Sequence, residues 1–95
     1  MFPLSFEKID LPETDSAKHT ILSQYQEQWA LINDSHHTKE NGYLFARIKV
    51  DPKDHQCYFA QKPDKNGNLT DIKMHYHDLE GLLVQGQNCI RHDFE

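Results

Sequence analysis

The sequence predicts an α+β fold in which one long N-terminal helix packs on an antiparallel meander sheet of three to four strands. Apolar residues recur at helical spacing within 13–33, which indicates the helix. Apolar and polar residues alternate within 43–78, and turn-forming residues at 51–54 and 63–68 divide that stretch into three strands. The 95 residues suit a single domain covering 1–95, with one modest core.

Two elements are predicted ahead of the sheet. The segment 1–12 alternates apolar and polar residues, and Pro3 lacks a backbone N–H, so we expect an extended segment at a sheet edge or over the core. The segment 13–33 begins with residues that favour a helix N-terminus, and turn formers then predict a loop up to Gly42. The apolar stripe of this helix, which we expect to pack on the sheet, consists of Ile21, Leu22, Tyr25, Trp29 and Ile32.

The two turns predict how the three strands pair. The first, at 51–54, has the composition of a type I turn, and a four-residue loop pairs Val50 with His55. The second contains Asn66–Gly67, which is typical of a two-residue type I′ hairpin loop. A slip of one residue in either turn would exchange the faces of a strand. Both registers place the same apolar side chains towards the core, namely Ile48, Cys57, Phe59, Ile72 and Met74.

The opposite face of this sheet is the predicted partner-binding surface. Tyrosine, arginine and other aromatic residues are common at the centres of protein interfaces. Two coverings remain open, because the segment 1–12 or the segment 79–84 could fold over this face and bury it. The predicted binding residues are Tyr43, Phe45, Arg47, Tyr58, His75 and His77.

The segment 79–95 is predicted to hold a short helix or turn and a C-terminal strand. Asp78 would cap the helix, and Gly86 would end it. Cys57 and Cys89 are far apart and are interpreted as free thiols of a reducing compartment. The sequence shows neither a secretory signal pattern nor an apolar run of membrane length, so we expect a cytoplasmic location and no membrane association.

The charge balance favours a protein partner. Fifteen Asp and Glu against ten Lys and Arg give a formal net charge of −5, which opposes binding to nucleic acid. Aromatic and cationic side chains on one sheet face still leave a stacking platform for single-stranded nucleic acid as a minor alternative. The composition also leaves a homodimer open.

Candidate chemical groups are few. Cys57 is expected to face the core, where a thiol is inert, and no nucleophile motif is present, so no catalytic residue is predicted. His75 and His77 are expected on one face of a strand, but two imidazoles do not make a metal site. We therefore predict no metal and no cofactor.

The sequence favours a small, acidic, cytoplasmic protein-binding module. Such a module would inhibit or regulate a protein partner, in the manner of an antitoxin, an immunity protein or a phage inhibitor of host defence. The alternative is a small enzyme or metal-dependent protein that uses His75 and His77.

Overall fold

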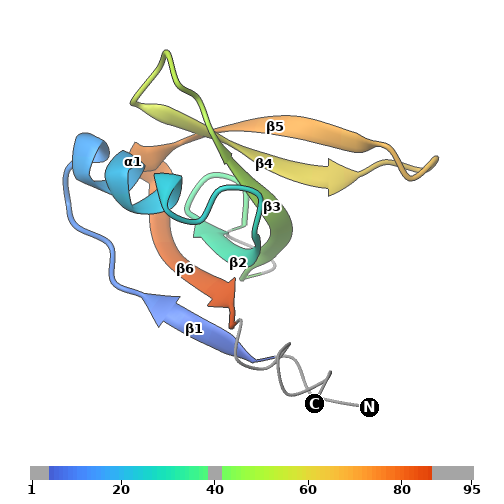
Figure 1. Ribbon diagram of the computed structural model, residues 1–95, viewed down its shortest axis with the longest axis horizontal. Coiled ribbons are helices and arrows are strands. Elements are labelled where there is room, and N and C mark those ends of the chain that lie inside the picture. Colours follow the sequence, from blue (N-terminus) through green and yellow to red (C-terminus); the bar gives the residue numbers. More distant parts are fainter. Residues whose placement is uncertain (1–4, 39–41, 87–95) are drawn as a thin grey trace.

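The computed structural model describes residues 5–38 and 42–86. Over these residues the chain forms one six-stranded antiparallel sheet with a single short α-helix (Figure 1). The strand order in the sheet is β1–β6–β2–β3–β4–β5. The elements are β1 Phe6–Ile9, α1 Asp15–Ser23, β2 Trp29–Asp34, β3 Leu44–Val50, β4 Cys57–Pro63, β5 Leu69–His75, the 3₁₀ helix η1 Tyr76–Asp78 and β6 Leu79–Gln85.

The predicted fold class is wrong, because most of the expected helix 13–33 is not helical. Helix α1 ends at Ser23, and Glu27 then adopts a φ of 65°, a left-handed conformation that a right-handed helix cannot contain. The amide of Glu27 donates to the carbonyl of Ile48, at 2.8 Å, and so ties the chain to β3. The apolar run that follows becomes β2, since a short apolar run fits a buried strand as well as a helix.

The three strands of the predicted meander lie where they were expected, but both registers are wrong. Val50 pairs with Tyr58 instead of His55. Residues 51–56 all belong to the connection, in which the carboxylate of Asp54 accepts from the amide of Gln56 at 3.0 Å. This local hydrogen bond lengthens the loop beyond the expected four residues.

The second turn differs from the expected type I′ hairpin loop. A type I′ turn requires a positive φ at both Asn66 and Gly67. Gly67 has a φ of 84°, but Asn66 does not have a positive φ, because Glu27 is the only described non-glycine residue with one. The amide of Gly67 donates to the carbonyl of Asp64, at 3.1 Å, which closes a type I turn followed by a left-handed glycine. The Asp64 carboxylate also accepts from the amides of Asn66 and Asn68, at 2.8 and 3.0 Å.

Each register differs from its prediction by an odd number of residues, and an odd shift exchanges the two faces of one strand relative to its neighbour. The two shifts therefore leave β3 and β5 on the expected faces and invert only β4, the strand between them. Ile48 of β3 and Met74 of β5 are fully buried on the core face, as predicted. In β4 the core side chains are Tyr58 and Ala60, whereas Cys57, Phe59 and Gln61 take the outer face.

The segment 79–85 is a strand where the sequence predicted a short helix or turn. Strand β6 inserts between β1 and β2 and pairs antiparallel with both, so its apolar run is supported on each side. Asp78 lies at the end of η1 and does not cap a helix there. The predicted strand near 89–91, the residue Cys89 and the start of segment 1–12 up to Leu4 lie outside the described residues.

The core lies on the inner face of the curved sheet, with α1 across it (Figure 1). Helix α1 contacts β3 and η1, and Leu22 is its fully buried apolar residue. The ammonium of Lys18, also buried, donates to the carbonyls of Tyr76 and Leu79, at 2.9 and 3.2 Å. Within residues 5–38 and 42–86, no helix has the length and apolar character needed to cross a membrane.

Candidate aromatic interface on the outer sheet face

A cluster of apolar side chains lies on the outer face of β1, β6, β2 and β3, the face opposite the core and α1. The rings of Trp29 and Phe45 stack with centroids 5.1 Å apart and an interplanar angle of 21°. Phe6 meets Phe45 edge-on, with centroids 6.5 Å apart. Leu31 pairs with Phe45 on one side and with Leu83 on the other, which places both leucines on the same face. We call these residues, together with Tyr43, the aromatic face.

The aromatic face is accessible to a partner in the described part of the chain. Tyr43 and Phe45 each retain 43% exposure, which is large for aromatic side chains. The hydroxyl of Tyr43 lies above Gly81 of β6, 3.7 Å from where a Cβ would stand. The aromatic face therefore extends across neighbouring strands without an element of residues 5–38 or 42–86 over it.

Arg47 stands beside this cluster, because its Cα is opposite that of Trp29. Its guanidinium lies 3.3 Å from the carboxylate of Glu27, and the arginine side chain is 29% exposed. The Nε atom is buried and has no hydrogen-bond partner among the described residues. Arg47 thus places a partly exposed cation, already paired with Glu27, at the border of the aromatic face.

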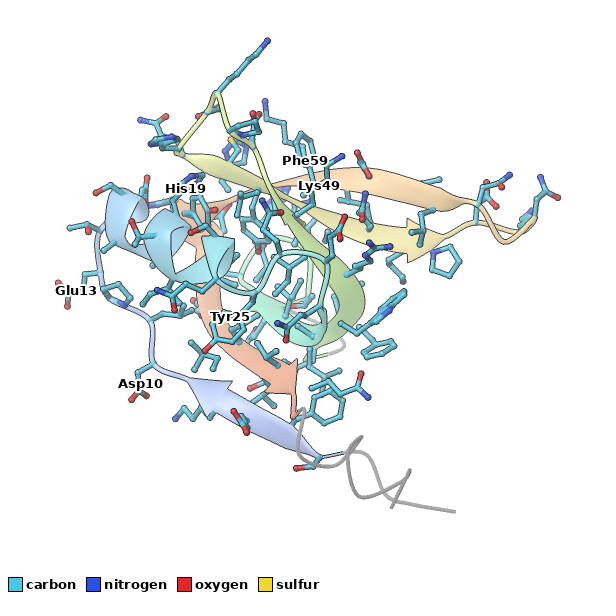
Figure 2. The ribbon with its side chains drawn as sticks, viewed as in Figure 1. Asp10, Glu13, His19, Tyr25, Lys49 and Phe59 are labelled. Atoms are coloured by element: carbon cyan, nitrogen blue, oxygen red, sulfur yellow. The ribbon has the colours of Figure 1, made fainter. Side chains whose placement is uncertain are left out.

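Cations lie on the outer face although the chain carries a net charge of −5. The strand registers place four cations and the carboxylate of Asp71 on this face. Lys49 lies next to Phe59 of the neighbouring strand (Figure 2). Carboxylates lie beside two of these cations, since Glu27 is 3.3 Å from Arg47 and Asp54 is 3.9 Å from Lys73. The four cations are Lys8, Arg47, Lys49 and Lys73.

Three of the predicted binding residues lie together as expected, and one does not. Phe45 and Arg47 share the outer side of β3, and Tyr43, directly before this strand, reaches Gly81 on the same side. Tyr58 is fully buried on the core face, where its ring stacks on Tyr76 with centroids 5.0 Å apart. Burial raises the pKa of Tyr58, and the negative charge of Asp34 raises it further. The inverted β4 is the reason that Tyr58 lies on the core face and not on the predicted outer face.

The two predicted histidines belong to different elements. His75 ends β5 and is exposed, whereas His77 lies in η1, so they do not share one strand face. His75 Nδ1 lies 3.2 Å from the Sγ atom of Cys57. Among the described residues, no group of three or more His, Cys, Asp or Glu side chains has the arrangement of a metal site.

The contact between Cys57 and His75 does not activate the thiol. Cys57 is 2% exposed. Burial raises the pKa of this thiol, and a hydrogen bond and the charge of the neighbouring Asp54 raise it further. The pKa of Asp54 is lowered, mainly by the hydrogen bond from the amide of Gln56 and then by the hydrogen bond with the Cys57 side chain. This shift keeps the Asp54 carboxylate charged. The thiol therefore stays protonated, and a protonated, buried thiol is a poor nucleophile.

Sequence reasoning missed the residue at the centre of the site. The sequence places Trp29 in the core stripe of a helix, because residues 29–32 are all apolar and show no alternation of residue type. In β2 the residues Ala30 and Ile32 are fully buried, whereas Trp29 and Leu31 face outwards. This alternation concerns burial and not residue type, so no local signal in the sequence places Trp29 beside Phe45.

No protein-family model, no curated protein and no solved structure matches the chain.

Proposed function

We propose that this protein is a binding module whose aromatic face docks onto a protein partner. The stacked pair of Trp29 and Phe45, on a face that no described element covers, is the observation that carries the proposal. Tryptophan, tyrosine and arginine dominate the energetics of protein interfaces, and Tyr43 and Arg47 adjoin this pair.

The chemistry of the face favours an apolar partner surface with acidic groups around it. Cations border the aromatic cluster, and a carboxylate of the partner would meet them with opposite charge. Inhibition or regulation of that partner, in a cytoplasmic setting, is the role that we infer for such a small module.

A protein fits this face better than single-stranded nucleic acid does. Bases stack on ring faces that are open to solvent. The rings of Trp29 and Phe45 cover each other, and the aliphatic side chains of Leu31 and Leu83 flank them. The net charge of −5 adds a long-range repulsion against a polyanion.

The enzymatic or metal-dependent alternative draws less support. His75 and His77 are on different elements, and the only thiol near His75 in the described chain is buried and protonated. Neither histidine adjoins the aromatic cluster in the strand register.

Parallel affinity captures from native lysate, with mass spectrometry, test the proposal. We expect Phe45→Ala and Arg47→Ala to lose a protein that the unchanged chain retains, roughly tenfold or more in affinity for a central residue. Gln24→Ala is the control, because Gln24 is exposed at the end of α1, on the side of the sheet opposite the aromatic face. A partner that both face variants retain at full strength would overturn the proposal. A partner lost on nuclease treatment, with tight binding to a labelled oligonucleotide, would replace it with nucleic-acid binding.

A further inference from the structure

Strand β5 forms an open edge of the sheet. It pairs only with β4 in the described chain and stands last in the strand order. Figure 1 shows the β4–β5 hairpin extending away from the rest of the sheet. Most of the β5 side chains are exposed, the exceptions being Ile72 and Met74 on the core face. An unprotected edge of this kind exposes backbone groups that can pair with another strand.

The hydrogen bonds at both ends of the hairpin show which backbone groups are free. The amide of Tyr76 donates to the carbonyl of Gln56, at 3.0 Å, and the amide of Asp64 donates to the carbonyl of Asn68, at 2.8 Å. Hydrogen-bonded and non-hydrogen-bonded pairs alternate in an antiparallel ladder, so the even-numbered residues of β5 bond to β4. The residues that direct their N–H and C=O groups away from β4 are therefore Leu69, Asp71, Lys73 and His75.

We propose that β5 is a self-association edge, which pairs antiparallel with β5 of a second copy about a two-fold axis at Ile72. This register places Asp71 opposite Lys73 of the second copy, and the symmetry repeats the pair. Leu69 then stands opposite His75 of the second copy. All the outward-directed backbone groups are hydrogen-bonded in this arrangement, because odd-numbered residues meet odd-numbered residues.

Charge selects this register over its neighbours. Shifting the axis to Asp71 would set two aspartates opposite each other, and shifting it to Lys73 would set two lysines opposite each other. Like charges that face each other across a strand pair are destabilising, and opposite charges are stabilising. A lysine usually protects an edge strand from association, because it repels the lysine of a second copy. In the one symmetric register that pairs Lys73 with Asp71, this lysine is attracted to the second copy instead.

Contacts within one copy leave both charges available. Asp71 Oδ1 accepts from Gln61 Nε2, at 2.8 Å, and no described group bonds its other carboxylate oxygen. Lys73 Nζ lies 3.9 Å from Asp54, and both side chains are largely exposed, at 54% and 41%. An exposed ion pair of that length contributes little and exchanges easily for a new partner.

The core side of the same edge supplies an apolar contact. Ile72 is partly buried against the hydrophobic core. On the two-fold axis it would meet Ile72 of the second copy in a non-hydrogen-bonded pair, in which side chains approach most closely. The association thus joins backbone hydrogen bonds, two opposite-charge pairs and a central apolar contact.

Sedimentation equilibrium over a concentration series tests the proposal with a charge exchange. The unchanged chain should reach dimer as concentration rises towards millimolar. Asp71→Lys and Lys73→Asp should each raise the dimer dissociation constant roughly tenfold or more, since two attractive pairs become repulsive. The double variant Asp71→Lys with Lys73→Asp should recover association, because the opposite-charge pairs are restored.

The control for net charge is Lys49→Asp, which removes an exposed lysine of β3 from the same sheet face and should leave the dissociation constant unchanged. Thermal melts of all variants should agree closely, because the changed side chains are exposed in one copy. A chain that stays monomeric at millimolar concentration overturns the proposal, as does a double variant that fails to recover. A dimer that both single charge variants keep, but that Phe45→Ala loses, would assign association to the aromatic face and overturn it as well.

Discussion

At the residue scale, Tyr58 shows how one change of face alters the meaning of a side chain. On an exposed surface a tyrosine at this position would be an anchor for a partner. In the structure it fills the core against Tyr76, and no protein group within the described chain pairs with its hydroxyl. Its ring therefore contributes to stability, and its hydroxyl contributes no protein hydrogen bond.

A pair of substitutions separates the ring of Tyr58 from its hydroxyl. Tyr58→Ala should lower the free energy of unfolding by about 3–5 kcal/mol, because a large buried ring is lost. Tyr58→Phe should change it by less than about 1 kcal/mol, since no protein hydrogen bond is removed. Urea unfolding of both variants measures the difference. A large loss with Tyr58→Phe would contradict this account of the hydroxyl.

Also at the residue scale, Lys18 shows how a buried charge is accommodated. Its ammonium donates to the carbonyls of Tyr76 and Leu79, which flank the turn between β5 and β6. Buried charges persist where they are well hydrogen-bonded. Lys18 thereby fixes α1 to the point where the chain turns from the free edge back into the sheet centre.

At the element scale, the described fold divides into what local patterns predict and what they do not. Alternation located β3, β4 and β5, because period two is a property of the sequence itself. Pairing depended on loop lengths, and those follow from side-chain hydrogen bonds of Asp54 and Asp64 that composition does not reveal. Strand β2 was missed because residues 29–32 are apolar throughout, which suits either element.

The same limit explains the candidate site. Phe45 and Arg47 lie on β3 and Tyr43 directly precedes it, so their shared face needed only the alternation within 43–50. Trp29 reaches Phe45 from β2, and the neighbouring leucine of β6 comes from further along the chain. Contacts between strands depend on sheet order, which no local pattern in this sequence specifies.

The β4–β5 turn makes a prediction that distinguishes the two turn types. Gly67→Ala should lower the free energy of unfolding by about 1 kcal/mol, because its φ of 84° strains a residue with a Cβ. Asn66→Ala should cost less than about 0.5 kcal/mol, since Asn66 does not adopt a positive φ. In a type I′ turn both substitutions would be costly. Denaturant unfolding of the two variants side by side gives the answer.

At the scale of the whole molecule, the two proposed surfaces are compatible. Residues opposite each other across an antiparallel pair share a face, so two copies joined at β5 would turn their aromatic faces to the same side. The aromatic face lies on β1, β6, β2 and β3, away from the β5 edge in the strand order. A dimer could then hold two partners, or two sites on one partner, and gain affinity through linkage.

Another whole-molecule property is the way α1 is joined to the loop 51–56 by two histidines. The rings of His19 and His55 stack with centroids 4.1 Å apart, and His19 Nδ1 lies 3.1 Å from the hydroxyl of Tyr76. Burial lowers the pKa of His19, the charge of His55 lowers it further, and the carboxylate of Asp51 opposes the shift. Protonation of both rings would place two positive charges in direct contact.

The pH dependence of stability follows from the direction of that shift. Because the pKa of His19 is lower in the folded chain, the unfolded chain binds more protons around its ordinary value of about 6.5. The contribution is fully present above that value and is lost as pH falls through it towards the lowered folded pKa. Urea unfolding at pH values of about 7.5 and 5.5 should therefore show a smaller loss of stability in His19→Gln than in the unchanged chain.

The matched control is His77→Gln, which removes an exposed imidazole from η1 without touching the stacked pair. If His19→Gln and His77→Gln lose stability equally between the two pH values, the stack of His19 on His55 is not the source of the pH dependence. If only His19→Gln flattens the profile, mild acid acts at the contact between α1 and the loop 51–56. Acidification would then loosen the helix from the core side of the sheet while leaving the aromatic face on the opposite side untouched.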